Sequence, residues 1–270
     1  MRIRRDRREA GSRWSMAGLI GLLMLSAVGG SPAEETAETD PMEVLAAMSD
    51  YVGNLQSFSL AFDSDIEVIT TELEKIQFAS SGTALVQRPD KIHAHRVGGY
   101  ADVEMWYDGT TVSVYGRSID AYTRFELQGT LDQLFHALRA GHGVALPGAD
   151  LLLSNAAEVL AHDVLQAKHI GRGVVGGAEC EHLAFRNADT DWQLWVEVGD
   201  TPIPRKMVIT SKTVNSAPQY TIRITEWESG VEPAEDAFDF APPEDAEPIR
   251  PDQLIELDEL PQGAPTGGTQ

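Results

Sequence analysis

Cysteine is almost absent from this sequence, because Cys180 is the only one among 270 residues. A single thiol excludes an internal disulfide, so the fold must rest on a hydrophobic core instead of covalent cross-links. The chain also lacks Cys-x-x-Cys, His-Glu-x-x-His and glycine-rich phosphate-loop motifs. The most recognisable kinds of zinc, redox and nucleotide site are therefore not predicted.

Basic residues are scarce as well. The whole chain has 21 Lys and Arg against 42 Asp and Glu, a formal charge of −21. Residues 1–33 hold six arginines and two acidic residues, so the remainder keeps 15 basic and 40 acidic residues, a formal charge of −25. Such a charge repels nucleic acid and anionic membrane surfaces. We therefore expect no nucleic-acid partner.

An arginine-rich start precedes the one long apolar run of the chain. Residues 1–13 contain six arginines, residues 14–28 are nearly all apolar or small, and residues 31–33 read Ser-Pro-Ala. This order predicts a secretory signal peptide over 1–33. The run of about 15 residues is shorter than the ~20 needed to span a bilayer. A retained membrane anchor is the alternative.

The rest of the chain predicts one domain followed by a tail. The roughly 237 residues after the leader are enough to build a core without disulfides. We expect the domain over 34–250 and a flexible acidic tail over 251–270. No other segment approaches a transmembrane length, so we expect a periplasmic monomer whose mature chain is not stably inserted into a membrane.

One helix is predicted before the first strand. Asp40 is a suitable N-cap and Pro41 a suitable first helical residue. Leu45, Met48 and Val52 then recur at helical spacing. These signals predict a helix over residues 41–54.

The apolar residues then change to a period of two. In the stretch SFSLAFDSDIEV, Phe58, Leu60 and Phe62 occupy even positions, which predicts a long half-buried strand. About ten strands follow this pattern in two batches, over 57–127 and 165–227, with short helices between them. Most links are short, and short links require antiparallel pairing. The predicted fold class is α+β: a strongly curved antiparallel sheet, forming an incomplete, half-open barrel, covered by a few helices.

Cys180 and His182, in the stretch CEHLAF, are the first candidates for chemistry. Residues two apart on a strand share a face, with Cα atoms about 6.6 Å apart. A nucleophile and its base need reacting atoms within about 3.5 Å, normally from different elements. Leu183 and Phe185 fall on the opposite face by alternation. We expect two neighbours on a strand, with a metal or redox site and a cysteine nucleophile as alternatives.

Two histidines on one strand are the second candidate. His93 and His95 share a face and are suitable ligands for zinc or copper, with His162, His169 or His182 as a third ligand. The same spacing is also common on a solvated face of a strand. We expect neither a metal nor another cofactor.

Acidic residues along one strand are the third candidate. Asp63, Asp65 and Glu67 alternate along one face, and paired carboxylates can act as general acid and base. On so acidic a chain, a solvated face is the expected arrangement. The sequence therefore predicts no catalytic residue, and we do not expect an enzyme.

Apolar residues at alternate positions of several strands are expected to share the concave face of the sheet. They form either a core filled by the helices or the lining of a cavity for an apolar ligand. Each buried methylene contributes about 0.8 kcal/mol, so roughly ten give micromolar affinity after entropy losses. The expected lining residues are Phe58, Leu60, Phe62, Ile76, Phe78, Trp106, Trp192, Leu194, Ile209 and Ile222.

Eight stretches between residues 41 and 250 carry a family resemblance. They are MSDYVGNLQSFSL, RPDKIHAHR, WYDGTTVSVY, LPGADLLLSN, GGAECEHLAFRNADTDWQLWVE, PIPRKMVIT, APQYTIRITEW and FDFAPPEDAEPI. Together they resemble a domain-of-unknown-function family of predicted periplasmic bacterial proteins, which is grouped with the outer-membrane lipoprotein carriers (LolA/LolB-like). The Tyr-Asp-Gly hairpin and the terminal Phe-x-Phe-x-Pro-Pro carry the link to the carriers.

The resemblance implies an incomplete antiparallel barrel, closed by helices, around an apolar cavity. In the carriers this cavity holds lipoprotein acyl chains, and Arg88 and Arg96 are candidates for their gating arginine. The family has no established activity, so the resemblance implies no catalytic residue. We expect a hydrophobic ligand, a lipid or a lipoprotein acyl chain, and a carrier or chaperone role. The alternatives are a non-catalytic envelope module with a filled core, and a Cys/His hydrolase or metalloprotein.

Overall fold

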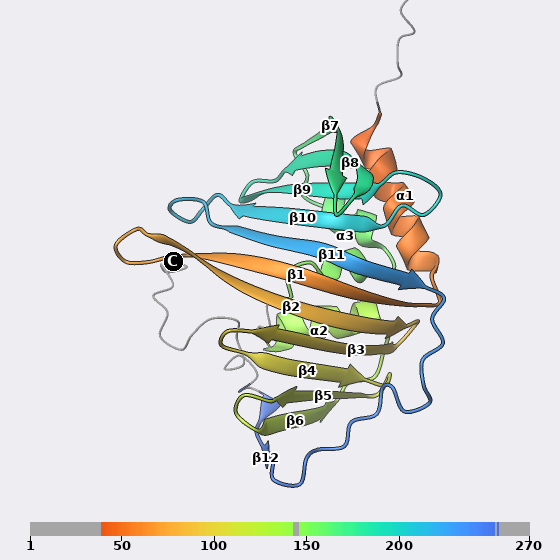
Figure 1. The fold of residues 1–270 in the computed structure, drawn as a ribbon, viewed down its shortest axis with the longest axis vertical. Helices are drawn as coiled ribbons and strands as arrows, with labels where there is room; N and C mark the ends of the chain where they lie inside the picture. Colours follow the sequence, from red (N-terminus) through yellow and green to blue (C-terminus); the bar gives the residue numbers. More distant parts are fainter. Residues whose placement is uncertain (1–38, 143–145, 252, 254–270) are drawn as a thin grey trace, which may run out of the picture. The chain divides into compact units, whose positions relative to one another are not determined.

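One sheet of twelve strands organises the computed structural model, which describes residues 39–142, 146–251 and 253 (Figure 1). The strand order is β12-β6-β5-β4-β3-β2-β1-β11-β10-β9-β8-β7. The strands are β1 (Ser57–Ile69), β2 (Lys75–Gln87), β3 (Lys91–Gly98), β4 (Asp102–Tyr107), β5 (Thr111–Gly116), β6 (Ala121–Glu126), β7 (Gln166–Val175), β8 (Ala178–Arg186), β9 (Thr190–Glu197), β10 (Pro204–Ser211), β11 (Gln219–Ser229) and β12 (Glu247–Pro248). The helices are α1 (Pro41–Asn54), α2 (Leu131–His142), the 3-10 helix η1 (Ala149–Leu152) and α3 (Ala156–Ala161).

The two batches of strands join through β1 and β11. These strands pair antiparallel from Phe58 opposite Ser229 to Ile66 opposite Tyr220. Every other neighbouring pair is antiparallel except β12 with β6, a two-residue parallel pairing that the sequence pattern did not predict. Within the described residues the end strands β12 and β7 do not pair with each other, so the sheet stays open. The predicted fold class is confirmed.

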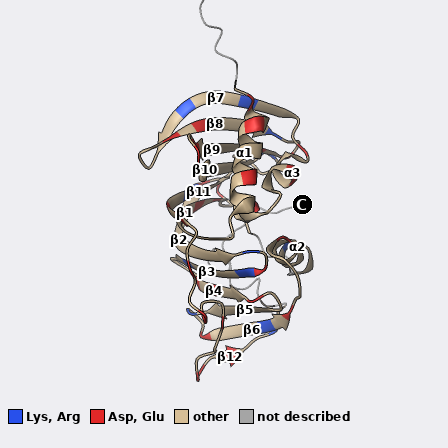
Figure 2. Ribbon diagram, turned by 90° about the vertical axis from the view of Figure 1, so that its right-hand side faces the viewer, with Lys and Arg blue, Asp and Glu red and all other residues tan. Residues whose placement is uncertain are grey.

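The helices lie on one face of the curved sheet, here called the inner face (Figure 2). The side chain of Asp40 accepts a hydrogen bond from the Met42 amide at 2.8 Å, and Pro41 begins α1, as predicted. Leu45, Met48 and Val52 are completely buried, because α1 turns its apolar stripe toward the sheet.

A capping box begins α2. The Thr130 amide donates to the side-chain oxygen of Gln133 at 2.8 Å, and the Gln133 amide donates to the Thr130 hydroxyl at 3.4 Å. Leu131, Leu134 and Leu138 are almost completely buried beneath this helix. Both ends of the packing stripe predicted from the sequence are thus in contact with the core.

Several predictions concern residues outside the described part. The predicted signal peptide over 1–33 lies there, and so does the predicted tail apart from Pro251 and Gln253. In the part that the structure describes, the helices are too short or too polar to cross a lipid bilayer.

Candidate ligand cavity

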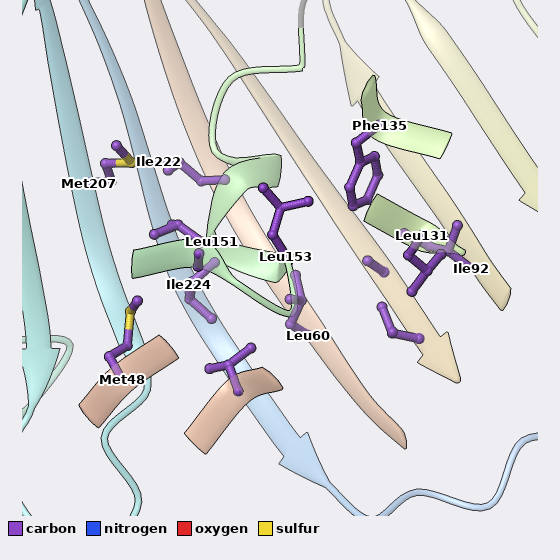
Figure 3. Close-up of a cluster of buried hydrophobic side chains, with 14 of the residues drawn as sticks. Met48, Leu60, Ile92, Leu131, Phe135, Leu151, Leu153, Met207, Ile222 and Ile224 are labelled. Atoms are coloured by element: carbon purple, nitrogen blue, oxygen red, sulfur yellow. The ribbon is translucent and has the colours of Figure 1, made fainter. Parts of the chain in front are cut away.

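A cavity of about 230 Å³ lies between the inner face of the sheet and a cover made by α2 and the segment 146–152. Figure 3 shows Leu151 from η1 and Phe135 from α2 on the cover side, opposite Leu60 and Ile222 on the strands. The sheet contributes mainly Leu60, Phe62, Ala84, Ala94, Ile222 and Ile224. The cover contributes mainly Phe135, Leu138, Leu146, Pro147, Ala149 and Leu151.

Two small residues leave this space open. Ala84 and Ala94 face each other across β2 and β3, and Ala84 also faces Leu60 of β1. Both alanines line the cavity. Protein interiors are otherwise close-packed, so two methyl groups beneath a helical cover leave a volume that larger side chains would fill.

Gly82 shapes the wall next to these alanines. A Cβ atom at this position would lie 2.5 Å from the ring of Phe62 and 2.5 Å from the carbonyl oxygen of His95. The Phe62 ring therefore lies across the strand at Gly82, where any other residue would displace it. The ring consequently forms part of the cavity wall.

Polar contacts hold the segment 146–154, here called the cover segment, in place. Arg88, at the end of β2, donates to the carbonyl oxygen of Leu152 at 2.7 Å. Arg139 of α2 donates to the carbonyl oxygen of Leu146 at 3.0 Å and pairs with Asp150. Burial lowers the pKa of Arg88, against the attraction of Asp132. The cover is thus fixed to both the sheet and α2.

One end of the cavity is polar. Arg96 lines it and also lines a second cavity of about 200 Å³ next to it. Tyr220 lines the main cavity, and burial raises its pKa, while its hydrogen bond to Ser64 and the positive charge of Arg96 act in the opposite direction. The hydroxyl oxygens of Ser64 and Ser80 are 2.8 Å apart. Polar groups therefore gather beside Arg96.

The structure brings only some of the ten predicted lining residues to these cavities. Leu60, Phe62 and Ile222 line the main cavity, and Phe78 lines the second one. Whether any of them binds a ligand remains a prediction.

Four further residues on the prediction lie in packed parts of the core. Phe58 is completely buried and stacks on Trp227, with ring centroids 4.8 Å apart. Trp192 stacks on Phe185 at 3.9 Å. The last two, Leu194 and Ile209, pack in the same core.

Ile76 and Trp106 lie outside the core. Ile76 is 42% exposed near the β1–β2 hairpin, at the end of the strand. Trp106 points away from the helices, because pairing of Ala94 with Met105 gives the inner positions of β4 to the odd-numbered residues. Its ring stacks on His93 at 4.8 Å, on the opposite or outer face.

Sequence reasoning missed the cover side of the cavity. Leu138, Leu146 and Leu151 all line it, yet none was among the predicted lining residues. The apolar stretch LPGADLLL was the available signal, because a loop this apolar must be buried against something.

Cys180 and His182 each have partners of their own. Cys180 is completely buried and donates weakly to the carbonyl oxygen of Ala178 at 3.5 Å. Burial, followed by the nearby Glu197 carboxylate, raises the pKa of the thiol, which favours the poorly nucleophilic neutral form. The His182 ring stacks on Trp195 at 4.0 Å. This arrangement fits two structural side chains of one strand.

His93 and His95 are each bound to a carboxylate on β4. His93 lies 2.7 Å from Glu104, and His95 lies 2.8 Å from Asp102. Arg117 also pairs with Glu104. Across the described ranges, no group of three or more His, Cys, Asp or Glu residues is placed to hold a metal ion.

The acidic row on β1 is paired across the neighbouring strands. Asp63 accepts a hydrogen bond from the Ser81 hydroxyl at 2.6 Å. Asp65 lies 3.6 Å from Arg223, and the next acid, Glu67, pairs with a lysine of β2 at 3.0 Å. These contacts tie β1 to its neighbours on the outer face.

Three solved structures show similarity to the chain. An uncharacterised conserved protein from Thermus thermophilus has 9% identity and a TM-score of 0.45, with 77% of this chain and 97% of that chain covered. The MucA/MucB complex from Pseudomonas aeruginosa has 16% identity and a TM-score of 0.43, covering 75% and 62%. The lipoprotein LppX from Mycobacterium tuberculosis has 14% identity and a TM-score of 0.44, covering 72% and 99%. Nothing about function follows from similarities at this level.

No curated protein matches the chain at a significant level. A family model does match: the one described as "Predicted periplasmic protein (DUF2092)" covers residues 41–250. The match spans most of the sequence and confirms both the family resemblance and the periplasmic localisation expected from it. The chain therefore belongs to this family of predicted periplasmic proteins.

Proposed function

We propose that the protein binds an apolar or lipid-like ligand in the cavity beneath the cover segment. The supporting observation is the cavity itself, about 230 Å³ with an almost wholly apolar lining, inside a core that is otherwise closely packed. An apolar cavity of about 150 Å³ is large enough to bind benzene. The space suits a small apolar molecule or part of one alkyl chain.

The position of the cavity supports the same proposal. Its cover is a short 3-10 helix and a loop, held by hydrogen bonds from Arg88 and Arg139 to backbone carbonyl groups. Such a cover can be displaced at lower cost than a sheet strand, because few residues must move. A periplasmic carrier or chaperone for lipids or lipoprotein acyl chains is the specific role that we infer.

The test combines lipid extraction with a cavity-filling substitution. The protein purified from the periplasm of its own host is analysed by native mass spectrometry, and uptake of a fluorescent acyl chain is titrated. Ala84→Leu places a larger side chain in the cavity and should weaken uptake at least ~tenfold, since a few lost methylene contacts are worth more than 1.4 kcal/mol. Thr83→Leu adds bulk at an exposed position of the same strand and should leave uptake unchanged.

Two results would contradict the proposal. The first is an absence of both co-purified lipid and acyl-chain uptake, which would favour the envelope module. The second is equal uptake by the Ala84→Leu and Thr83→Leu variants, because the acyl chain would then bind elsewhere.

A further inference from the structure

Arg96 is a feature of the cavity that a purely apolar ligand does not use. It lies on β3, half-buried, two residues beyond Ala94 on the inner face. Among the described residues that line the main cavity, it is the only Lys, Arg, Asp or Glu. The chain has twice as many acidic as basic residues, so an inward-facing cation runs against its overall charge.

The surroundings of Arg96 are polar on one side and apolar on the other. The residue lines both cavities, so its side chain lies where they adjoin. Tyr220 lies within electrostatic reach of the guanidinium, and Ser64 bonds to both Tyr220 and Ser80. One cation and three hydroxyl groups thus gather at one end of a space whose other walls are hydrocarbon.

We propose that the cavity takes a single-chain amphiphile with an anionic head group, its alkyl chain beneath the cover segment and its carboxylate or phosphate on the Arg96 guanidinium. This inference rests on the proposed function. A guanidinium forms paired, charge-assisted hydrogen bonds with either anion, and these are stronger where water is partly excluded. A volume of about 230 Å³ is below the usual range of ~300–1,000 Å³ for ligand pockets, which favours one chain over two.

The test compares three ligands that share one alkyl chain. Decanoate, decyl phosphate and 1-decanol are titrated calorimetrically into the purified protein below their micelle concentrations. At least one anion should bind ~10–100-fold more tightly than the alcohol, the effect of one charge-assisted contact. Arg96→Met should remove this preference without changing the affinity for 1-decanol, and Arg96→Lys should retain part of it.

The control is Arg223→Met, which removes the same charge from the outer face, where Arg223 lies 3.6 Å from Asp65. This variant should keep the wild-type preference. A stronger response to decanoate or to decyl phosphate identifies the head group as carboxylate or phosphate, and either response supports the inference.

Three outcomes separate failure of the inference from failure of the proposed function. Equal binding of 1-decanol and both anions by the wild-type protein overturns the anionic head group but leaves apolar binding intact. A preference that persists in Arg96→Met overturns the role of Arg96. Binding of none of the three ligands contradicts the proposed function itself. The wild-type comparison decides the ligand class even if Arg96→Met does not fold.

Discussion

The inner face of the sheet is filled under α1 and hollow under the cover segment. Helix α1 packs against β7, β8 and β9, where Leu183 and Leu194 are completely buried and Phe185 stacks on Trp192. Under the cover segment, β2 and β3 offer small residues at the equivalent inner positions, and a cavity of about 230 Å³ remains. Side-chain volume, and not the alternation of polar and apolar residues, therefore separates the packed region from the hollow one.

The largest expected effect comes from the same truncation in the two regions. Leu194→Ala, in the packed region, should lower the free energy of unfolding by about 4 kcal/mol, because the new space has no neighbour able to fill it. Leu60 already borders the cavity, makes fewer contacts, and on truncation should lose about 2 kcal/mol. Urea unfolding of both variants measures the difference. Equal losses would mean that the two regions are packed alike.

The reverse substitution should separate the regions in the opposite sense. Ala156 begins α3 and is completely buried, so Ala156→Leu should cost about 1–3 kcal/mol through overpacking. Ala84→Leu extends into the cavity and should change stability by less than about 1 kcal/mol, or raise it. Thermal unfolding of the two variants, without added ligand, gives the comparison. A large loss in Ala84→Leu would argue that the cavity has no room for the side chain.

The smallest effect is expected at the thiol of the packed region. Cys180 is completely buried, and burial raises the pKa of its thiol. A thiol reagent at pH 8 should therefore react with the native protein ~100-fold more slowly than with the urea-unfolded chain, since reaction requires both exposure and the thiolate. Leu194→Ala should speed this reaction more than Leu60→Ala. Rapid labelling of the wild-type protein would contradict the packing of β8.

The sequence predicted the sheet and its helical face well, because both depend on periodicity. Strand alternation correctly turned Leu60 and Ile222 inward, and the Asp40 and Pro41 signals located α1. Trp106 was assigned to the wrong face, because inner and outer positions of β4 depend on its register with β3, which a single strand does not reveal. The short strand β12 was missed because it pairs with β6 through only two residues.

The cavity was harder to predict than the face that holds it. The pattern around Ala84 and Ala94 is the same whether a helix fills the space above them or leaves it empty. The outcome depends on the path of the cover segment, which the hydrogen bond from Arg88 to Leu152 fixes over 64 positions of sequence. Arg96 was likewise visible as an inward position of β3, but its meaning depends on the cavity around it.

A crystal structure under xenon pressure tests the central claim most directly, because xenon enters apolar cavities without needing a specific ligand. The claim predicts a xenon atom between Ala84, Ala94 and Leu151, and none in the packed region around Leu183 and Trp192. It also predicts that Ala84→Leu removes this atom. A wild-type crystal with no xenon beneath the cover segment, or with xenon under α1 instead, would contradict it.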